Sequence, residues 1–395
     1  MQTDVIAPHL ASLGSLLLLG LSAQWLATQT KLPRVTLLIL LGIALGPSGF
    51  NVIGEVANQE FAWISTVALA MVGFLLGGKL DRRFLKAQGK VVLGHSIIIT
   101  LATWLTVALA MGLLLDQWAL GFLLGAIATA TDPAAVHDVI NENKYSDDHT
   151  EQLLGIVALD DIWGLIVFGF SLILAAEFLP TNGDNGTLHI AIELIGAVGL
   201  GVALGLPIGY ITGRTQKGEP MLIEALGAVL LCAGIALWID VSYLLACIVM
   251  GITVTNTARH HKRPFHAIDH IEWPFMLLFF ALAGASLSLD QLQNLGAIGI
   301  LYIACRIGGR SLGGAIALKT NKGRAGDGVE LGMSLLPQAG IAIGTALIAS
   351  QIFPQLTDIL LPTALGATIV FELIGPPILA YNLKRRSQRE QRPKT

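Results

Sequence analysis

Long apolar runs follow one another along almost the whole chain, separated by short links, and each is about as long as a membrane-crossing helix. Such a helix needs roughly 20 predominantly apolar residues. Only 13% of the residues are charged, against about 25% in soluble domains. The pattern predicts an all-α polytopic membrane protein with about thirteen transmembrane helices. The runs lie at about 9–27, 32–50, 61–78, 91–114, 118–139, 152–178, 188–213, 221–239, 241–258, 273–288, 293–318, 327–350 and 358–381.

The lysines and arginines gather on one side of the predicted membrane. Of the 24 such residues, 22 fall in the odd-numbered links or after the last run, and the even-numbered links contain none. Cytoplasmic loops of membrane proteins carry an excess of these cations. We therefore expect the N-terminus outside the cell membrane and the C-terminus in the cytoplasm, with a short basic tail, 382–395, at the membrane surface. The remaining two cations, Arg306 and Arg310, lie inside the eleventh run.

Two of the runs contain a proline near the middle. Pro133 lies in the fifth run, and Pro337, followed by Gln338, lies in the twelfth. Proline removes a helix hydrogen bond and restricts the residue before it, so we expect interrupted helices rather than two ordinary kinks. Because the breaks are seven runs apart, they predict inverted repeats in one membrane domain. The expected divisions of 1–395 are repeat one at about 9–178, a linker helix at 188–213 and repeat two at about 221–381.

Three aspartates lie in stretches that otherwise have the composition of lipid-buried helix. Asp132 follows Thr131 at the first break, and Asp160 and Asp161 are adjacent in the sixth run. A carboxylate at the centre of a membrane helix costs about 2.5–3.5 kcal/mol on insertion scales. Two carboxylates in a low-dielectric site resist ionising together, so one of the pair can exchange a proton for a cation. A hard cation prefers oxygen ligands, and we expect a monovalent cation to bind Asp161, Asp132 and Thr131, with Asp160 as a second acid.

The other charged residues inside the runs are given lesser roles. Arg306 is the expected charge partner, most simply of Asp160, because a buried arginine stays charged. Arg310 lies one turn nearer the cytoplasmic end, and its long side chain is expected to extend to that surface. Glu372, midway along the last run, is expected to be packed or interfacial rather than part of the ion path.

The combination of these motifs, rather than any one of them, resembles the monovalent cation:proton antiporter superfamily, the sodium/proton exchangers. The resemblance covers nearly the whole chain. It implies a six-helix core with two crossed, unwound helices beside a dimerisation domain, a homodimer, and alternating access by an elevator-like movement. It also implies that Asp161 binds the cation or proton, and that Thr131 and Asp132 mark the first crossing. The residues that carry it are Thr131-Asp132-Pro133, Asp160-Asp161, Arg306, Gly308 and the broken twelfth run.

The chain mixes features of two branches of this superfamily. Its paired acids resemble the electrogenic antiporters, whereas Thr131-Asp132-Pro133 resembles the electroneutral ones. The electroneutral branch has a glutamate five residues before the essential aspartate, and Ile156 stands there in this chain. That branch commonly has an arginine at the second break, where this chain has Gln338. The resemblance therefore leaves both the stoichiometry and the partner of Arg306 open.

The expected function is sodium/proton exchange serving pH homeostasis, with cation and proton competing for Asp161 and no cofactor. Potassium/proton exchange on the same fold is the alternative. A passive channel is disfavoured by the paired breaks. An intramembrane aspartyl protease would also use two membrane aspartates, but it takes them from two helices and resembles a Gly-x-Gly-Asp pattern that this chain does not contain. We therefore expect a transporter and not an enzyme.

Overall fold

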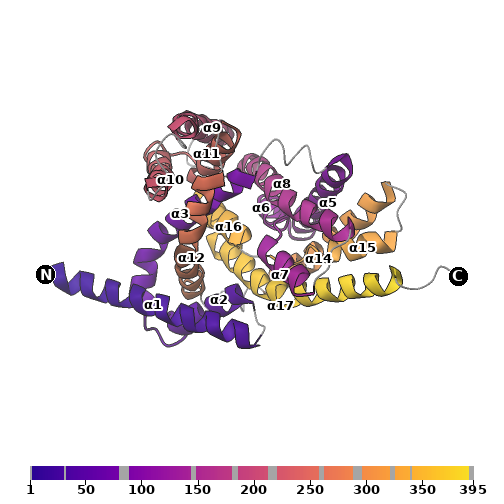
Figure 1. Ribbon diagram of the computed structural model, residues 1–395, viewed down its shortest axis with the longest axis horizontal. Helices are drawn as coiled ribbons and strands as arrows, with labels where there is room; N and C mark the ends of the chain where they lie inside the picture. Colours follow the sequence, from indigo (N-terminus) through magenta and orange to yellow (C-terminus); the bar gives the residue numbers. More distant parts are fainter. Residues whose placement is uncertain are drawn as a thin grey trace. The chain divides into compact units, whose positions relative to one another are not determined.

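The computed structural model describes residues 2–30, 33–79, 89–143, 148–179, 186–211, 220–257, 262–287, 296–320, 325–338 and 340–390, and the regular secondary structure in these ranges is helical (Figure 1). Each predicted apolar run coincides with one helix or with an interrupted pair, so the all-helical membrane fold is confirmed. The helices are α1 Gln2–Thr30, α2 Arg34–Leu45, α3 Gly54–Lys79, α5 Gly89–Leu115, α6 Trp118–Ile127, α7 Pro133–Asn143, α8 Asp148–Phe178, α9 Gly186–Ile211, α10 Pro220–Trp238, α11 Tyr243–Thr257, α12 Lys262–Ala285, α14 Gly296–Thr320, α15 Ala325–Met333, α16 Gly340–Ile352 and α17 Thr357–Glu390, with a short 3-10 turn η1 at Pro354–Leu356.

The chain divides into two compact units, and each draws helices from both predicted repeats. One unit contains α1, α3, most of α2, and α9 to α12. The other contains α5 to α8 and α14 to α17, which correspond to runs four to six and eleven to thirteen. The second unit therefore has the composition of the six-helix core that the family resemblance implies. The inverted relation between the two repeats stays a prediction.

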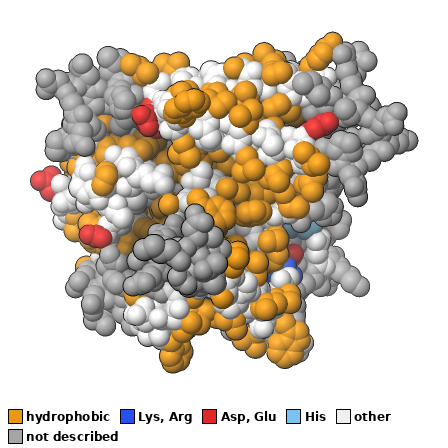
Figure 2. All heavy atoms as spheres, turned by 90° about the vertical axis from the view of Figure 1, so that its left-hand side faces the viewer, with side chains coloured by type: hydrophobic (Ala, Val, Ile, Leu, Met, Phe, Trp, Pro, Cys, Tyr) orange, Lys and Arg blue, Asp and Glu red, His pale blue; other side chains and the backbone are white. Residues whose placement is uncertain are grey.

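The outer faces of several helices are apolar. On α5, Leu101, Leu105, Leu109 and Leu113 are exposed at a spacing of four residues, whereas Ile99, Thr103, Val107 and Met111 on the opposite face are buried. A continuous exposed stripe of leucine is unfavourable in water and favourable against lipid. Figure 2 shows the same character, with apolar side chains spread over the face that it presents. The helices α1, α3, α5, α8, α9 and α17 are long and apolar enough to cross a bilayer.

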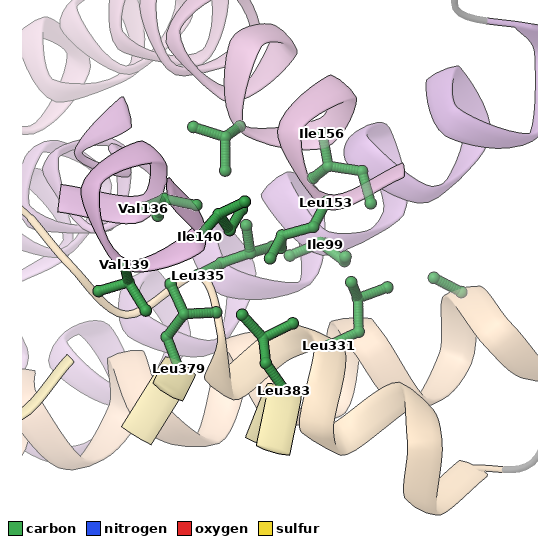
Figure 3. Packing of buried hydrophobic residues seen from close by; sticks show 12 residues of the cluster. Ile99, Val136, Val139, Ile140, Leu153, Ile156, Leu331, Leu335, Leu379 and Leu383 are labelled. Carbon is green, nitrogen blue, oxygen red and sulfur yellow. The ribbon is translucent and has the colours of Figure 1, made fainter. Parts of the chain in front are cut away.

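One apolar cluster in the second unit holds both interrupted helices (Figure 3). Val136 and Ile140 of α7 pack there against Leu153 of α8, and Leu335, from the second interruption, joins them together with Leu379 of α17. Ile156 is fully buried in the same cluster. Burying a leucine or isoleucine side chain stabilises a fold by about 1.5–3 kcal/mol, so this cluster anchors α7 to α8 and α17.

Glycines allow α14 to approach its neighbours closely. A Cβ at Gly309 or Gly313 would meet the backbone of α5, and a Cβ at Gly314 would meet the backbone of α15. From the other side, a Cβ at Gly332 of α15 would collide with the carbonyl oxygen of Arg310. Small residues at helix contacts are typical of membrane proteins, where close backbone packing drives association. Gly309, Gly313 and Gly314 therefore form small-residue contacts between α14 and its neighbours α5 and α15.

We expect Gly332→Ala to destabilise the protein by roughly 1–3 kcal/mol, because the added methyl group meets backbone that cannot rotate away. Gly326→Ala is the matched control on the same helix, since a Cβ there has open space around it. This control is expected to be neutral or to stabilise by up to about 1 kcal/mol. Thermal unfolding of the purified protein in detergent measures both, and equal melting temperatures for the two variants would contradict the packing argument.

Candidate functional site

The two prolines interrupt their helices as the sequence predicts. The fifth run is divided into α6 and α7, with residues 128–132 between them, and the twelfth is divided into α15 and α16 after Met333. Pro133 is the first residue of α7, a position where the missing N–H has no helical partner to lose. Both interruptions are deeply buried, and Thr131, Leu336 and Gln338 are each 1% exposed or less.

The interruptions contact each other directly. The backbone N–H of Asp132 donates a hydrogen bond of 2.9 Å to the carbonyl oxygen of Pro337. Backbone groups outside helices must be satisfied when they lie at membrane depth, and irregular backbone is tolerated there only inside protein or along a cavity. The second break therefore supplies an acceptor for a backbone N–H of the first, and we refer to this contact within the second unit as the crossing.

Asp132 caps the helix that follows the first break. Its carboxylate oxygens accept hydrogen bonds of 3.1 Å from the backbone N–H groups of Ala134 and Ala135. This is the usual arrangement for an aspartate at a helix N-terminus, where the partial positive charge of the helix also favours a carboxylate. Asp132 therefore compensates the positive end of the half-helix α7.

Arg306 binds the backbone of both breaks. Its Nε donates to the carbonyl of Ala128 at 2.9 Å, and its Nη2 donates to that of Ala130 at 2.7 Å. Its Nη1 donates to the carbonyl of Leu336 at 2.6 Å, across the crossing. The guanidinium also lies over the ring of Phe371, 4.2 Å from the centroid. The carbonyl ends of α6 and α15 carry partial negative charge, and a single buried cation compensates both.

The ion pair expected between Arg306 and Asp160 is made by Arg310 instead. Arg310 Nη1 lies 2.6 Å from Asp160 Oδ2, with both side chains fully buried, so Arg310 does not extend to the cytoplasmic surface as expected. Thr131 joins the pair, donating its hydroxyl to Asp160 Oδ2 at 2.7 Å and accepting from Arg310 Nη2 at 2.9 Å. Arg310 Nη2 also donates to the carbonyl of Thr129. The result is a buried network that ties α8 and α14 to the first break.

Asp161 lies on α8 beside this network and is 2% exposed. The same helix packs directly against the first break three residues further on, where a Cβ at Gly164 would lie 3.0 Å from the hydroxyl of Thr129. Gln338, at the second break, donates its side-chain amide to the carbonyl of Ile127 at 3.1 Å and to the Tyr302 hydroxyl at 3.2 Å. The paired acids and both breaks are therefore in one buried region.

The family model of the sodium/hydrogen exchanger transmembrane region matches residues 14–383. The chain belongs to the sodium/hydrogen exchanger family. Members of this exchanger family are transporters rather than enzymes, and the chain is a multi-pass membrane protein whose family substrates are a monovalent cation and the proton.

Individual exchangers of the same kind are distant in sequence. The ammonium/H(+) antiporter subunit AmhT of Alkalihalophilus pseudofirmus is 27% identical over 293 residues, which are 73% of each chain. The Na(+)/H(+) antiporter 1 of Methanocaldococcus jannaschii is 24% identical, and the aligned region covers 91% of this chain and 89% of that antiporter. The solved structure of the sodium proton antiporter MjNhaP1 from Methanocaldococcus jannaschii superposes with a TM-score of 0.70, at 22% identity, over 98% of this chain and 97% of that one. The structural likeness confirms the exchanger fold.

Within this exchanger fold, the site residues that the sequence predicts lie at the two breaks, on α8 or on α14. Those residues are Thr131, Asp132, Pro133, Asp160, Asp161, Arg306, Pro337 and Gln338. Arg310 was expected to reach the membrane surface and is instead fully buried against Asp160, whereas Glu372, which was expected to be packed or interfacial, is buried in α17. The four-residue spacing of Arg306 and Arg310, which places both on one helix face, could have pointed to the buried position of Arg310.

Proposed function

We propose that this protein exchanges protons for a monovalent cation, most simply sodium, and that cation and proton compete for Asp161. The observation that carries the proposal is the contact between the two breaks, where the N–H of Asp132 bonds the Pro337 carbonyl beside the buried acids of α8. Interrupted helices supply carbonyl and carboxylate oxygens at membrane depth, and these are the ligands that a hard cation prefers.

The fixed charges around the two acids support Asp161 as the exchanging group. Asp160 has a permanent cation of its own in Arg310, together with the hydroxyl of Thr131. An arginine does not release its proton under ordinary conditions, so Asp160 is suited to remain an anion. A second adjacent carboxylate then has a strong electrostatic reason to bind either a proton or a metal cation. Oxygens of Asp132 and Thr131 are the proposed additional ligands of the cation.

Alternating access is the proposed mode of transport. The crossing is held by the backbone bond between the breaks, by the guanidinium of Arg306, and by the side chains of Gln338 and Thr131. The apolar cluster around Leu335 and Val136 supports the half-helices α7 and α15 beside it. We propose that this helix set carries Asp161 between the two sides of the membrane, which requires the cation and the proton to cross in opposite directions.

The decisive experiment is exchange in everted membrane vesicles with the membrane potential clamped. Asp161→Asn is expected to reduce cation-driven proton flux to background, because an amide side chain neither binds and releases a proton nor carries the negative charge that attracts a cation. Asp358→Asn, which replaces an exposed acid in the first turn of α17, is the matched control and should keep wild-type flux. Wild-type flux in Asp161→Asn would refute the assignment. Proton flux without any counter-cation would refute exchange and favour a channel.

The identity of the cation is tested in the same vesicles. Two archaeal relatives are named as Na(+)/H(+) antiporters, whereas AmhT is named as part of an ammonium/H(+) antiporter. Sodium is the proposed cation, and potassium or ammonium is the alternative. Adding sodium, lithium, potassium and ammonium in turn should give the largest proton flux with sodium, and a flux with potassium or ammonium alone would select the alternative.

We further propose a homodimer in the cell membrane, with the N-terminus outside, the C-terminus in the cytoplasm and a role in pH homeostasis. The lysine and arginine bias of the links supports the orientation. The unit formed by α1 to α3 and α9 to α12 is the proposed dimerisation domain, and α5 to α8 with α14 to α17 form the proposed transport core. Native mass spectrometry that finds only monomers would contradict the dimer, and protease access to the C-terminus from outside the cell would contradict the orientation.

A further inference from the structure

The last turns of α17 lie against α15, the half-helix that leads into the second break. The last predicted apolar run ends near residue 381, whereas α17 continues as a helix to Glu390. Leu379 of α17 packs in the apolar cluster with Leu331 of α15 and with Leu335, which follows α15 in the second break. The basic end of α17 is therefore placed where it can act on the second break through α15.

Asn382 of α17 bonds the last turn of α15. Its side-chain amide donates to the backbone carbonyl of Glu330 at 3.1 Å and to the hydroxyl of Ser334 at 3.2 Å. Ser334 is fully buried and is the first residue after α15, and its own hydroxyl donates to the Glu330 carbonyl at 2.7 Å. Carbonyls in the last turn of a helix depend on donors from outside the helix. Asn382 therefore ties the end of α15, and with it the first residue of the second break, to α17.

Ion pairs join the same two helices nearer the surface. The Oε1 atom of Glu330 lies 3.1 Å from Arg385 Nη1 and 3.1 Å from Arg389 Nη2. Arg389 Nη1 lies 3.2 Å from Asp327 Oδ1. The two arginine side chains are 50% and 43% exposed, whereas that of Glu330 is 16% exposed. Asn382, Arg385 and Arg389 follow one another at intervals of three and four residues, so they share one face of α17.

The exposure of these ion pairs makes them sensitive to salt. Dissolved ions screen exposed charges, and the screening length falls from about 30 Å at 0.01 M to about 3 Å at 1 M. One exposed pair contributes little to the stability of a fold. Here two arginines converge on one carboxylate of α15, and the backbone of the same residue holds Ser334. We therefore expect screening to act on the position of the second break more than on the stability of the whole protein.

We propose that Asn382, Arg385 and Arg389 of α17 form a clamp with Glu330 and Asp327 of α15, that this clamp positions the second break, and that it makes the exchange rate depend on the ionic strength at the cytoplasmic surface. Its members are positioning residues, because they act on the site through α15. The proposal rests on the proposed exchange function and orientation. It gives the arginines a partner inside the protein, in addition to the membrane surface expected for the basic tail.

The test measures exchange in everted vesicles, whose outer face is the cytoplasmic one in the proposed orientation. Choline chloride is raised from about 0.01 M to about 1 M, with the osmolarity balanced across the membrane. The wild-type rate should fall about threefold to tenfold, the loss expected when two exposed ion pairs worth a few-fold each are screened. Glu330→Gln keeps the shape of the side chain and removes its charge, so this variant should start near the lower rate and change little with salt.

Lys384→Gln is the matched control, because it removes an exposed cation from the same turn of α17. In the described part of the chain, Lys384 forms no ion pair with Glu330 or Asp327. This variant should keep both the wild-type rate and the wild-type dependence on salt. An equal loss of salt dependence in Lys384→Gln would assign the effect to general surface charge, such as the binding of anionic lipid headgroups, and would overturn the clamp.

A second readout needs no transport. Hydrogen exchange of the purified protein, followed by mass spectrometry, should be faster over 334–338 at high salt than at low salt in the wild type. It should already be faster at low salt in Glu330→Gln and in Asn382→Ala. Asn382→Ala removes the donor to Ser334 without changing any charge. Its rate of cation exchange should therefore be lower than that of the wild type but should still fall as salt is added.

The opposing outcomes separate the clamp from the exchange function. Equal salt dependence in the wild type and Glu330→Gln would overturn the clamp. If Glu330→Gln does not fold, Arg385→Gln combined with Arg389→Gln removes the same contacts from the side of α17. Absence of cation-driven flux in the wild type would refute exchange but leave the hydrogen-exchange comparison valid. Normal flux, with unchanged protection of 334–338 in every variant, would refute the clamp alone.

Discussion

Arg310→Met is expected to lower the free energy of unfolding by about 3–5 kcal/mol, one of the two largest losses that the structure predicts. The substitution removes the partner of Asp160, whose Oδ2 lies 2.6 Å from Arg310 Nη1 with both side chains fully buried. It leaves a buried carboxylate without its cation, and it also takes a donor from Thr131. Denaturant unfolding in detergent micelles, followed by circular dichroism, measures the change.

A double-mutant cycle separates the ion pair from general packing. Asp160→Asn alone leaves Arg310 buried without its counter-charge, whereas Arg310→Met with Asp160→Asn removes both charges. The double variant should therefore lose less free energy of unfolding than the sum of the two single losses. A coupling of about 0.5–3 kcal/mol is expected for groups in direct contact. The control is Arg385→Met, whose partner Glu330 lies 3.1 Å away with the arginine half exposed. A surface pair contributes less than about 1 kcal/mol, and a control loss as large as that of Arg310→Met would refute the interpretation.

Arg306→Gln is expected to abolish exchange and to loosen both breaks. Three carbonyls, those of Ala128, Ala130 and Leu336, lose their shared donor. Each buried acceptor left unsatisfied costs about 1–3 kcal/mol. Hydrogen exchange followed by mass spectrometry should therefore show faster exchange over 128–132 and 334–338, and vesicle assays should show flux close to background.

Arg306→Lys provides the matched comparison, because it keeps the charge. An ammonium group lacks the planar fork of arginine and cannot reach three carbonyls in the same geometry. This variant should lie between the wild type and Arg306→Gln in both flux and hydrogen exchange. Unchanged protection of both breaks in Arg306→Gln, together with wild-type flux, would show that the carbonyl contacts are dispensable.

The sequence predicts the helices and breaks well because both depend on local properties. The length of each apolar run determines whether a helix can cross a bilayer, and Pro133 and Pro337 each remove a backbone donor at a defined point. The capping role of Asp132 follows from its position directly before Pro133, the first residue of α7. These features require no knowledge of how one helix packs on another.

The roles of the arginines depend on packing, and the sequence assigned them wrongly. Arg306 and Arg310 share one face of α14, and only the approach of that helix to α8 and to the breaks decides which of them meets Asp160. Depth along the helix favoured a surface position for Arg310, but its side chain is fully buried and bonds Asp160 on α8 and Thr131 at the first break.

Two other residues illustrate the same limit. Ile156, where the family resemblance implies an acid, lies fully buried in the apolar cluster around Leu153 and Leu335. Glu372 contacts Asp132, a residue of α17 meeting one that is 240 positions earlier in the chain. Such a contact follows from tertiary packing alone, and no local pattern in the sequence predicts it.

The way in which Arg306 is shared has a consequence for movement. Because one guanidinium serves carbonyls on both sides of the crossing, a displacement of one break withdraws a donor from the other. If one break changed conformation alone, buried backbone carbonyls would lose their hydrogen-bond donor, so we expect the two breaks to move together as a single hinge. In the alternating access proposed above, opening toward either side of the membrane would be an all-or-none event, and the two sides would not be open at the same time.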